Sequence, residues 1–89
     1  MKKQIPKHQQ ERTVEVLFGE ILKQIRKENG LSQEYLSFES GYHRTYISLL
    51  ERGKKSPSLK TIFQLAKVLN INPSEFIDRI QKKVHTDRT

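Results

Sequence analysis

The chain has 89 residues, enough for one small domain with a single apolar core. Hydrophobic residues make up 34% of it and charged residues 30%, so nearly every apolar side chain is needed for that core. The absence of cysteine excludes disulfides, thiolate metal sites and cysteine nucleophiles, and makes the cytoplasm the expected compartment. There is no run of roughly 20 apolar residues for a membrane span and no apolar block of a signal peptide, so we expect a soluble protein that is not exported.

The charge of the chain is strongly positive. Its 17 Lys and Arg residues against 10 Asp and Glu residues give a net charge of +7, which predicts a polyanionic partner. Residues 1–12 and 81–89 are basic and poor in apolar side chains, so they are predicted to be solvated arms on either side of a domain at residues 13–80. Within that domain the positive charge is concentrated in residues 40–70, whose net charge is +5.

Apolar residues recur at spacings of three and four along the middle of the chain, which predicts an all-α fold. Five helices are expected: residues 14–28, residues 33–40, residues 43 or 44 to 52, the stretch between Pro57-Ser58 and Asn70, and a stretch that starts at Asn72-Pro73, carries Phe76, Ile77 and Ile80, and extends at most to Val84. Ser32 is a favourable N-cap for the second helix, and Gly41 and Gly53 stand where the second and third helices should end.

The second and third predicted helices are short and are joined by a tight glycine turn. Leu36 on one and Ile47 and Leu50 on the other point inward, which would hold the third helix rigidly at an angle to the second. This arrangement is typical of a helix-turn-helix. A rigid protruding helix fits the major groove of DNA, where the base edges distinguish all four base pairs.

Residues 31–77 resemble the Xre-like, lambda-repressor-like family of helix-turn-helix regulators. The motifs that carry the resemblance are Leu31-Ser32-Gln33-Glu34, Gly41, Arg44-Thr45-Tyr46-Ile47-Ser48, Glu51-Arg52-Gly53-Lys54, Pro57-Ser58-Leu59, and Leu65-Ala66 with Leu69. Among members of the family, the run HRTYIS followed by ERG is similar to the controller proteins of restriction-modification systems. The resemblance implies a compact five-helix DNA-binding domain.

On a helical wheel of residues 44–52, Ile47 and Leu50 face the core, so the opposite face is expected to enter the groove. The predicted base contacts are Arg44, Thr45, Ser48 and Leu49. Arg44 is the first candidate, because a guanidinium pairs bidentately with guanine O6 and N7. Thr45 offers a methyl group to thymine or a hydroxyl to a base edge or phosphate. The alternative for each is an ordinary exposed side chain of a surface helix.

A second set of contacts, to the phosphate backbone, would position the protein without reading sequence. The resemblance implies such contacts for Gln33, Tyr46, Lys54, Lys55 and Ser58, and the start and outward face of the third helix add His43 and Arg52. The alternative for His43 is capping of that helix, and for Tyr46 it is packing of the ring beside the second helix.

The family resemblance also implies an ion pair between Arg26 and Glu51, which would tie the third helix to the first. The alternative is two unrelated surface charges. Phe38 departs from the family pattern, since a polar residue is usual there. We expect it either to pack against the first helix or a tail, or to contact another protein.

One reading helix covers about half a turn of DNA, so relatives bind as two-fold dimers with half-sites about 34 Å apart. The predicted dimer interface is Phe76, Ile77 and Ile80, and the alternative is that these side chains pack on the first helix.

The function expected from the sequence is a homodimeric regulator that binds an inverted repeat in double-stranded DNA near a promoter and blocks or recruits polymerase. The alternative is an antitoxin-like interaction module with secondary DNA binding. We expect no cofactor, metal ion, membrane or small-molecule substrate. An enzyme is disfavoured because no carboxylate pair, nucleophile with its base, or phosphate-binding glycine loop is recognisable.

Overall fold

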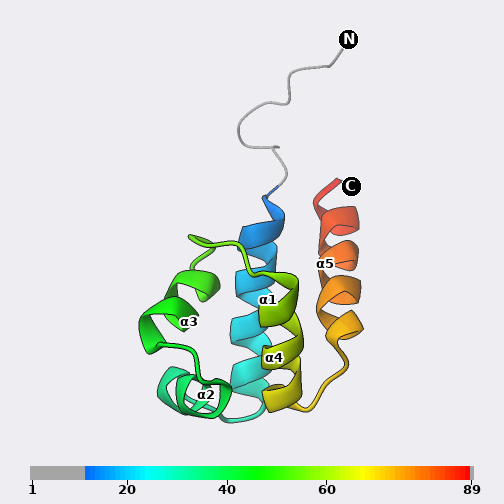
Figure 1. The fold of residues 1–89 in the computed structure, drawn as a ribbon. Coiled ribbons are helices and arrows are strands. Elements are labelled where there is room, and N and C mark those ends of the chain that lie inside the picture. Colours follow the sequence, from blue (N-terminus) through cyan, green and yellow to red (C-terminus); the bar gives the residue numbers. More distant parts are fainter. Residues whose placement is uncertain (1–11, 89) are drawn as a thin grey trace.

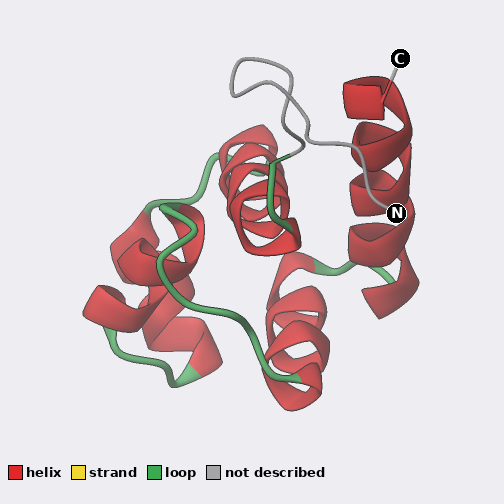
Figure 2. Cartoon of the chain, turned by 90° about the horizontal axis from the view of Figure 1, so that it is seen from above, coloured by secondary structure: helices red, strands yellow, loops and turns green. Residues whose placement is uncertain are grey.

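The computed structural model describes residues 12–88, which form helices and loops with no strand (Figures 1 and 2). The helices are α1 (Val14–Glu28), α2 (Gln33–Ser40), α3 (Arg44–Glu51), α4 (Leu59–Leu69) and α5 (Pro73–Arg88). The predicted all-α, five-helix fold is confirmed. The proposed N-terminal arm, apart from Arg12, lies outside the described residues.

Local capping residues set where the helices begin and end. The side-chain oxygens of Thr13, Ser32 and Ser58 each accept a hydrogen bond from the backbone N–H three residues later, at the starts of α1, α2 and α4. Gly41 ends α2 with φ 80° and Asn70 ends α4 with φ 57°, both in the left-handed region. Because these signals are local, the ends at Ser32, Gly41 and Asn70 were predicted from the sequence; the cap at Thr13 was not.

α1 is the central scaffold, with α3 packed on one side of it and α5 on the other (Figure 1). α2 packs against α3 and α4, and α4 packs against α5. Side chains from all five helices fill one core, in which the rings of Phe18 on α1 and Phe76 on α5 lie 5.0 Å apart. No helix within residues 12–88 is both long and apolar enough to span a membrane.

The basic stretch predicted to be a C-terminal arm continues α5 as far as Arg88. Two of its cations have acidic partners: Lys82 lies 3.1 Å from Asp78, one turn earlier, and Lys83 lies 3.8 Å from Glu20 of α1. Just before this stretch, Arg79 pairs with Glu75 at 2.8 Å and with Glu28 of α1 at 3.7 Å. These partly exposed pairs add to the apolar contacts of α5 and account for a helix longer than the apolar pattern alone indicates.

Candidate DNA-binding surface

The position of α3 depends on a close approach between its C-terminal turn and α1. Gly19 is buried in the middle of α1, and a Cβ atom placed on it would lie 2.3 Å from the carbonyl oxygen of Leu50 and 2.6 Å from that of Glu51. Only a residue without a side chain allows the two backbones to come this close. The role of Gly19 was not predicted from the sequence, because a glycine inside a helical pattern gives no sign of what packs on it.

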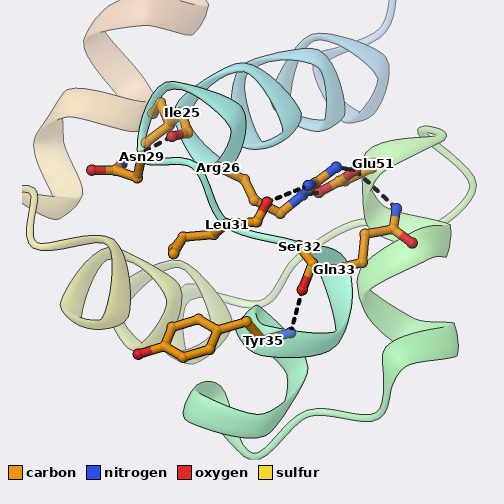
Figure 3. A network of polar contacts seen from close by, with 8 residues as sticks. All are labelled: Ile25, Arg26, Asn29, Leu31, Ser32, Gln33, Tyr35 and Glu51. Carbon is orange, nitrogen blue, oxygen red and sulfur yellow. Dashed lines mark hydrogen bonds and ion pairs between the residues drawn. The ribbon is translucent and has the colours of Figure 1, made fainter.

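A buried ion pair joins the C-terminal turn of α3 to α1 (Figure 3). Arg26 Nε lies 2.6 Å from Glu51 Oε2, and Arg26 Nη2 donates to Glu51 Oε1 at 3.0 Å. The third nitrogen, Nη1, donates to the carbonyl oxygen of Leu31 at 2.7 Å. The hydrogen bond with Glu51 raises the pKa of the Arg26 guanidinium above its ordinary value, although burial opposes the rise. The ion pair expected from the family resemblance is thus present, and it is buried.

Gln33, a predicted phosphate contact, belongs to the same network. Its Nε2 donates to Glu51 Oε1 at 3.0 Å, so the first turn of α2 is tied to the last turn of α3 (Figure 3). One amide hydrogen of Gln33 is used inside the protein. The other remains for an external acceptor.

His43 caps the start of α3. Its Nδ1 accepts a hydrogen bond from the backbone N–H of Thr45 at 3.1 Å, which is the capping role expected as the alternative to a phosphate contact. Since Nδ1 is an acceptor here, any hydrogen on the neutral ring is on Nε2.

The structure gathers several predicted DNA contacts around one shallow polar depression. Its lining residues are Gln33, Arg44, Thr45, Ser48 and Arg52. Arg44 and Thr45 are exposed, and Arg52 Nε donates to Ser48 Oγ at 3.2 Å. Two arginines therefore flank a row of small hydroxyl side chains, an arrangement suited to base edges and phosphates.

Other predicted contacts lie beside this depression, on the turn that joins α3 to α4. Lys54 and Lys55 are exposed there, and Ser58 is the N-cap of α4. Leu49 is half-buried, and its carbonyl oxygen accepts a hydrogen bond from the backbone N–H of Lys54 at 2.9 Å.

The phosphate contact predicted for Tyr46 is not supported by the position of its hydroxyl group, which turns inward. Its Oη lies 3.1 Å from Thr61 Oγ1 on α4, and its ring packs against that of Tyr42 at 5.2 Å. The packing alternative is closer to the structure, although the hydroxyl partner lies on α4 and not on α2. A tyrosine at this point of an amphipathic helix is half-buried, and only the tertiary contact decides which way its polar end faces.

The apolar stripe of α5 is divided between the core and the surface. Phe76 is completely buried against α1, so its assignment to a dimer interface is wrong. Ile77 is 51% exposed and Ile80 is half-buried. Together with Val14 and Pro57 they line an apolar groove between α5, the start of α1 and the turn before α4.

Three further apolar side chains are exposed. Phe38 on α2 is 81% exposed, so it does not pack against α1. Leu59 and Phe63 lie on the outer face of α4. Among the side chains that the structure describes, those of residues 12–85, no group of three His, Asp or Glu could hold a metal ion.

A family model described as helix-turn-helix matches residues 22–76, which include all of α2, α3 and α4. The chain belongs to this helix-turn-helix family. The match covers the polar depression, the Arg26–Glu51 pair and the turn with the two lysines.

Curated members of the helix-turn-helix family that resemble the chain include control proteins. Control protein C.BamHI of Bacillus amyloliquefaciens is 42% identical over 66 residues, which cover 73% of this chain and 82% of that protein. Control protein C.SmaI of Serratia marcescens is 38% identical over 66 residues, covering 74% and 79%.

Solved structures of the family have the same fold. The restriction-modification controller protein C.AhdI from Aeromonas hydrophila is 46% identical, with a TM-score of 0.67 over 68% of this chain and 92% of that chain. The controller protein C.Esp1396I, crystallised as a tetramer with its natural 35 base-pair operator, is 30% identical, with a TM-score of 0.74 over 83% and 97%.

Proposed function

We propose that this protein is a transcriptional regulator that binds double-stranded DNA sequence-specifically, as a homodimer on an inverted-repeat operator. The observation that carries the proposal is the outward polar face of α3. There Arg44, Thr45 and Ser48 line one depression, while a buried ion pair fixes the C-terminal turn of the helix to α1. A helix held this rigidly keeps its side chains in register with base pairs.

Arg44 is the principal base-reading residue of the proposal. It is exposed in the first turn of α3, the part of a recognition helix that meets base edges. A guanidinium recognises guanine through two parallel hydrogen bonds, a pairing worth about 1–3 kcal/mol of discrimination. Thr45 and Ser48 offer hydroxyl groups beside it, and Thr45 adds a methyl group for thymine.

Phosphate contacts supply the non-specific part of the affinity. Lys54 and Lys55 lie next to α3 on an exposed turn, and Arg52 and Gln33 lie at the edge of the depression. Each cation that neutralises a phosphate releases condensed counterions, which favours binding at low salt. The net charge of +5 over residues 40–70 fits this role.

The dimer in this proposal forms through α5. Ile77 and Ile80 with Val14 and Pro57 present an apolar surface that water covers in the monomer. A two-fold axis at this surface would present two copies of α3 to successive turns of the same face of DNA. The C.Esp1396I complex, a tetramer on its operator, supports an oligomeric DNA-bound form in this family.

The proposal places the protein in the cytoplasm, at a promoter, where the bound dimer blocks or recruits polymerase. Relatives described as control proteins and as transcriptional regulators support this regulatory role.

Selection of bound duplexes from random DNA tests the reading helix. Arg44→Ala should remove the preference at one base pair in each half-site, at a cost of about 1–3 kcal/mol for that base pair only. Lys54→Ala is the matched control, because loss of a phosphate contact weakens all duplexes alike and lowers the salt dependence. Uniform weakening by Arg44→Ala would show that Arg44 contacts the backbone.

Sedimentation equilibrium tests the interface. Ile77→Glu should shift the protein from dimer to monomer without changing its helix content, since Ile77 is half exposed in the monomer. Phe38→Glu introduces the same charge at an exposed apolar side chain on α2 and should leave the dimer intact. If Phe38→Glu dissociates the dimer and Ile77→Glu does not, the interface lies on α2.

A further inference from the structure

Three hydroxyl groups form a chain that joins α3 to the start of α4. Tyr46 Oη lies 3.1 Å from Thr61 Oγ1, and Ser58 Oγ lies 2.9 Å from the same Thr61 atom. The backbone N–H of Thr61 also donates to Ser58 Oγ, at 3.0 Å. Thr61 is only 3% exposed, whereas Ser58 is exposed. The chain therefore runs from the reading helix through the interior to the surface.

The direction of the hydrogen bonds follows from the groups involved. A phenol is a better hydrogen-bond donor and a poorer acceptor than an alkyl hydroxyl, so Tyr46 donates to Thr61. Thr61 then has its single hydroxyl hydrogen left for Ser58. Hydrogen bonds that point the same way along a chain polarise and strengthen one another, which favours this direction.

The consequence falls on Ser58. With the hydrogen bonds in this direction, its oxygen accepts from both the N–H and the O–H of Thr61, which occupies its two lone pairs. What remains is its own hydrogen, on a residue that is exposed to solvent. Ser58 is thereby a donor only, and it suits an acceptor with no hydrogen of its own, such as a phosphate oxygen.

We propose that Thr61 is a positioning residue for DNA binding. It touches no DNA; it orients the Ser58 hydroxyl toward a backbone phosphate and links that contact to Tyr46 on the reading helix. The inference rests on the proposed function, in which Ser58 contacts phosphate. It also gives the inward-facing hydroxyl of Tyr46 a role in binding that needs no contact with the duplex.

The test measures affinity for the duplex recovered by selection, by fluorescence anisotropy, at a temperature where each variant is fully folded. Ser58→Ala should weaken binding about tenfold, the loss expected for a hydrogen bond to a charged group. Thr61→Val keeps the shape but removes the hydroxyl and should weaken binding about three- to fivefold. Thr61→Ser, which restores the hydroxyl, should return the affinity to that of the wild type.

Combined variants separate positioning from a merely structural role. Thr61→Val should have no further effect on affinity once Ser58→Ala is present, because it acts through Ser58. Tyr46→Phe should weaken binding about twofold alone and not at all beside Ser58→Ala. Tyr35→Phe, which removes a hydroxyl from an exposed ring on α2, is the matched control and should bind as the wild type does.

Wild-type affinity of Thr61→Val, or further weakening when it is added to Ser58→Ala, would overturn the inference. If Thr61→Val does not fold, the cycle of Tyr46→Phe with Ser58→Ala decides by the same criterion. A wild-type protein that selects no sequence would overturn the proposed function together with this inference. If the protein selects a DNA sequence in a way that depends on Arg44, but Thr61→Val binds with wild-type affinity, this inference alone would be overturned.

Discussion

Replacing Gly19 with alanine sets local helix propensity against tertiary packing. In the interior of a helix, Gly→Ala stabilises by about 1 kcal/mol, so propensity alone predicts a more stable protein. In the structure the new methyl carbon would stand 2.3 Å from the Leu50 carbonyl oxygen, and this contact must lengthen to about 3.4 Å before it is ordinary. The obstacle is backbone, so no side chain can turn aside, and the last turn of α3 has to move.

Overpacking of this kind costs about 1–3 kcal/mol. The shift also strains the ion pair of Arg26 with Glu51 without breaking it, which adds about 1 kcal/mol, a fraction of the roughly 3–5 kcal/mol that a broken buried pair costs. After the gain of about 1 kcal/mol in helix propensity is subtracted, we expect Gly19→Ala to lower the free energy of unfolding by about 2 kcal/mol. That is a large part of the roughly 5–15 kcal/mol available to a domain.

Urea unfolding followed by far-UV circular dichroism measures the effect. Gly30→Ala is the matched control: its Cβ would meet nothing within 4 Å, and only the positive φ of 69° is unfavourable. That strain should cost about 1–2 kcal/mol and leave DNA binding unchanged. Gly19→Ala should also weaken operator binding under conditions where it is folded, because α3 is displaced. A rise in stability of about 1 kcal/mol would refute the reasoning, since propensity would then have decided the outcome.

Three further predictions concern stability. Glu51→Ala should lower the free energy of unfolding by about 3–5 kcal/mol in urea titrations, because it leaves Arg26 buried without a partner. The double variant Arg26→Met with Glu51→Leu should recover most of this loss. If the double variant loses as much stability as Glu51→Ala, an explanation based on the unpaired charge is contradicted. Because the folded pKa of Arg26 is raised, its contribution is present at every pH below the ordinary arginine value and is lost only as the pH rises through the folded value. The stability difference between the wild type and the double variant Arg26→Met with Glu51→Leu, which leaves no unpaired carboxylate, should thus be constant from about pH 6 to 10, and a slope in that range would contradict it. Phe38→Gln should change the free energy of unfolding by less than about 0.5 kcal/mol, because the ring is 81% exposed; a larger loss would mean that the ring packs against the domain.

The sequence by itself determined the five helices, most of their ends and the choice of α3 as the helix proposed to face DNA. Caps such as Ser32 and Gly41 act on backbone groups a few residues away, so their effect is written in the local sequence. The division of α3 into an apolar and a polar face also follows from spacing alone. The pairing of Arg26 with Glu51 was expected from the motif that both residues match in the family, since no spacing rule relates residues 25 positions apart.

Tertiary structure alone decided which side chains face the core where two orientations were open. Phe76 and Ile77 are adjacent on the same apolar stripe, and only the docking of α5 on α1 buries one and exposes the other. Gly19 is unfavourable in an isolated helix and essential where α3 approaches. The hydroxyl of Tyr46 became an internal link because Thr61 lies opposite it. Each outcome depends on a partner far away in the chain, and the residues adjacent in sequence do not indicate which partner it is.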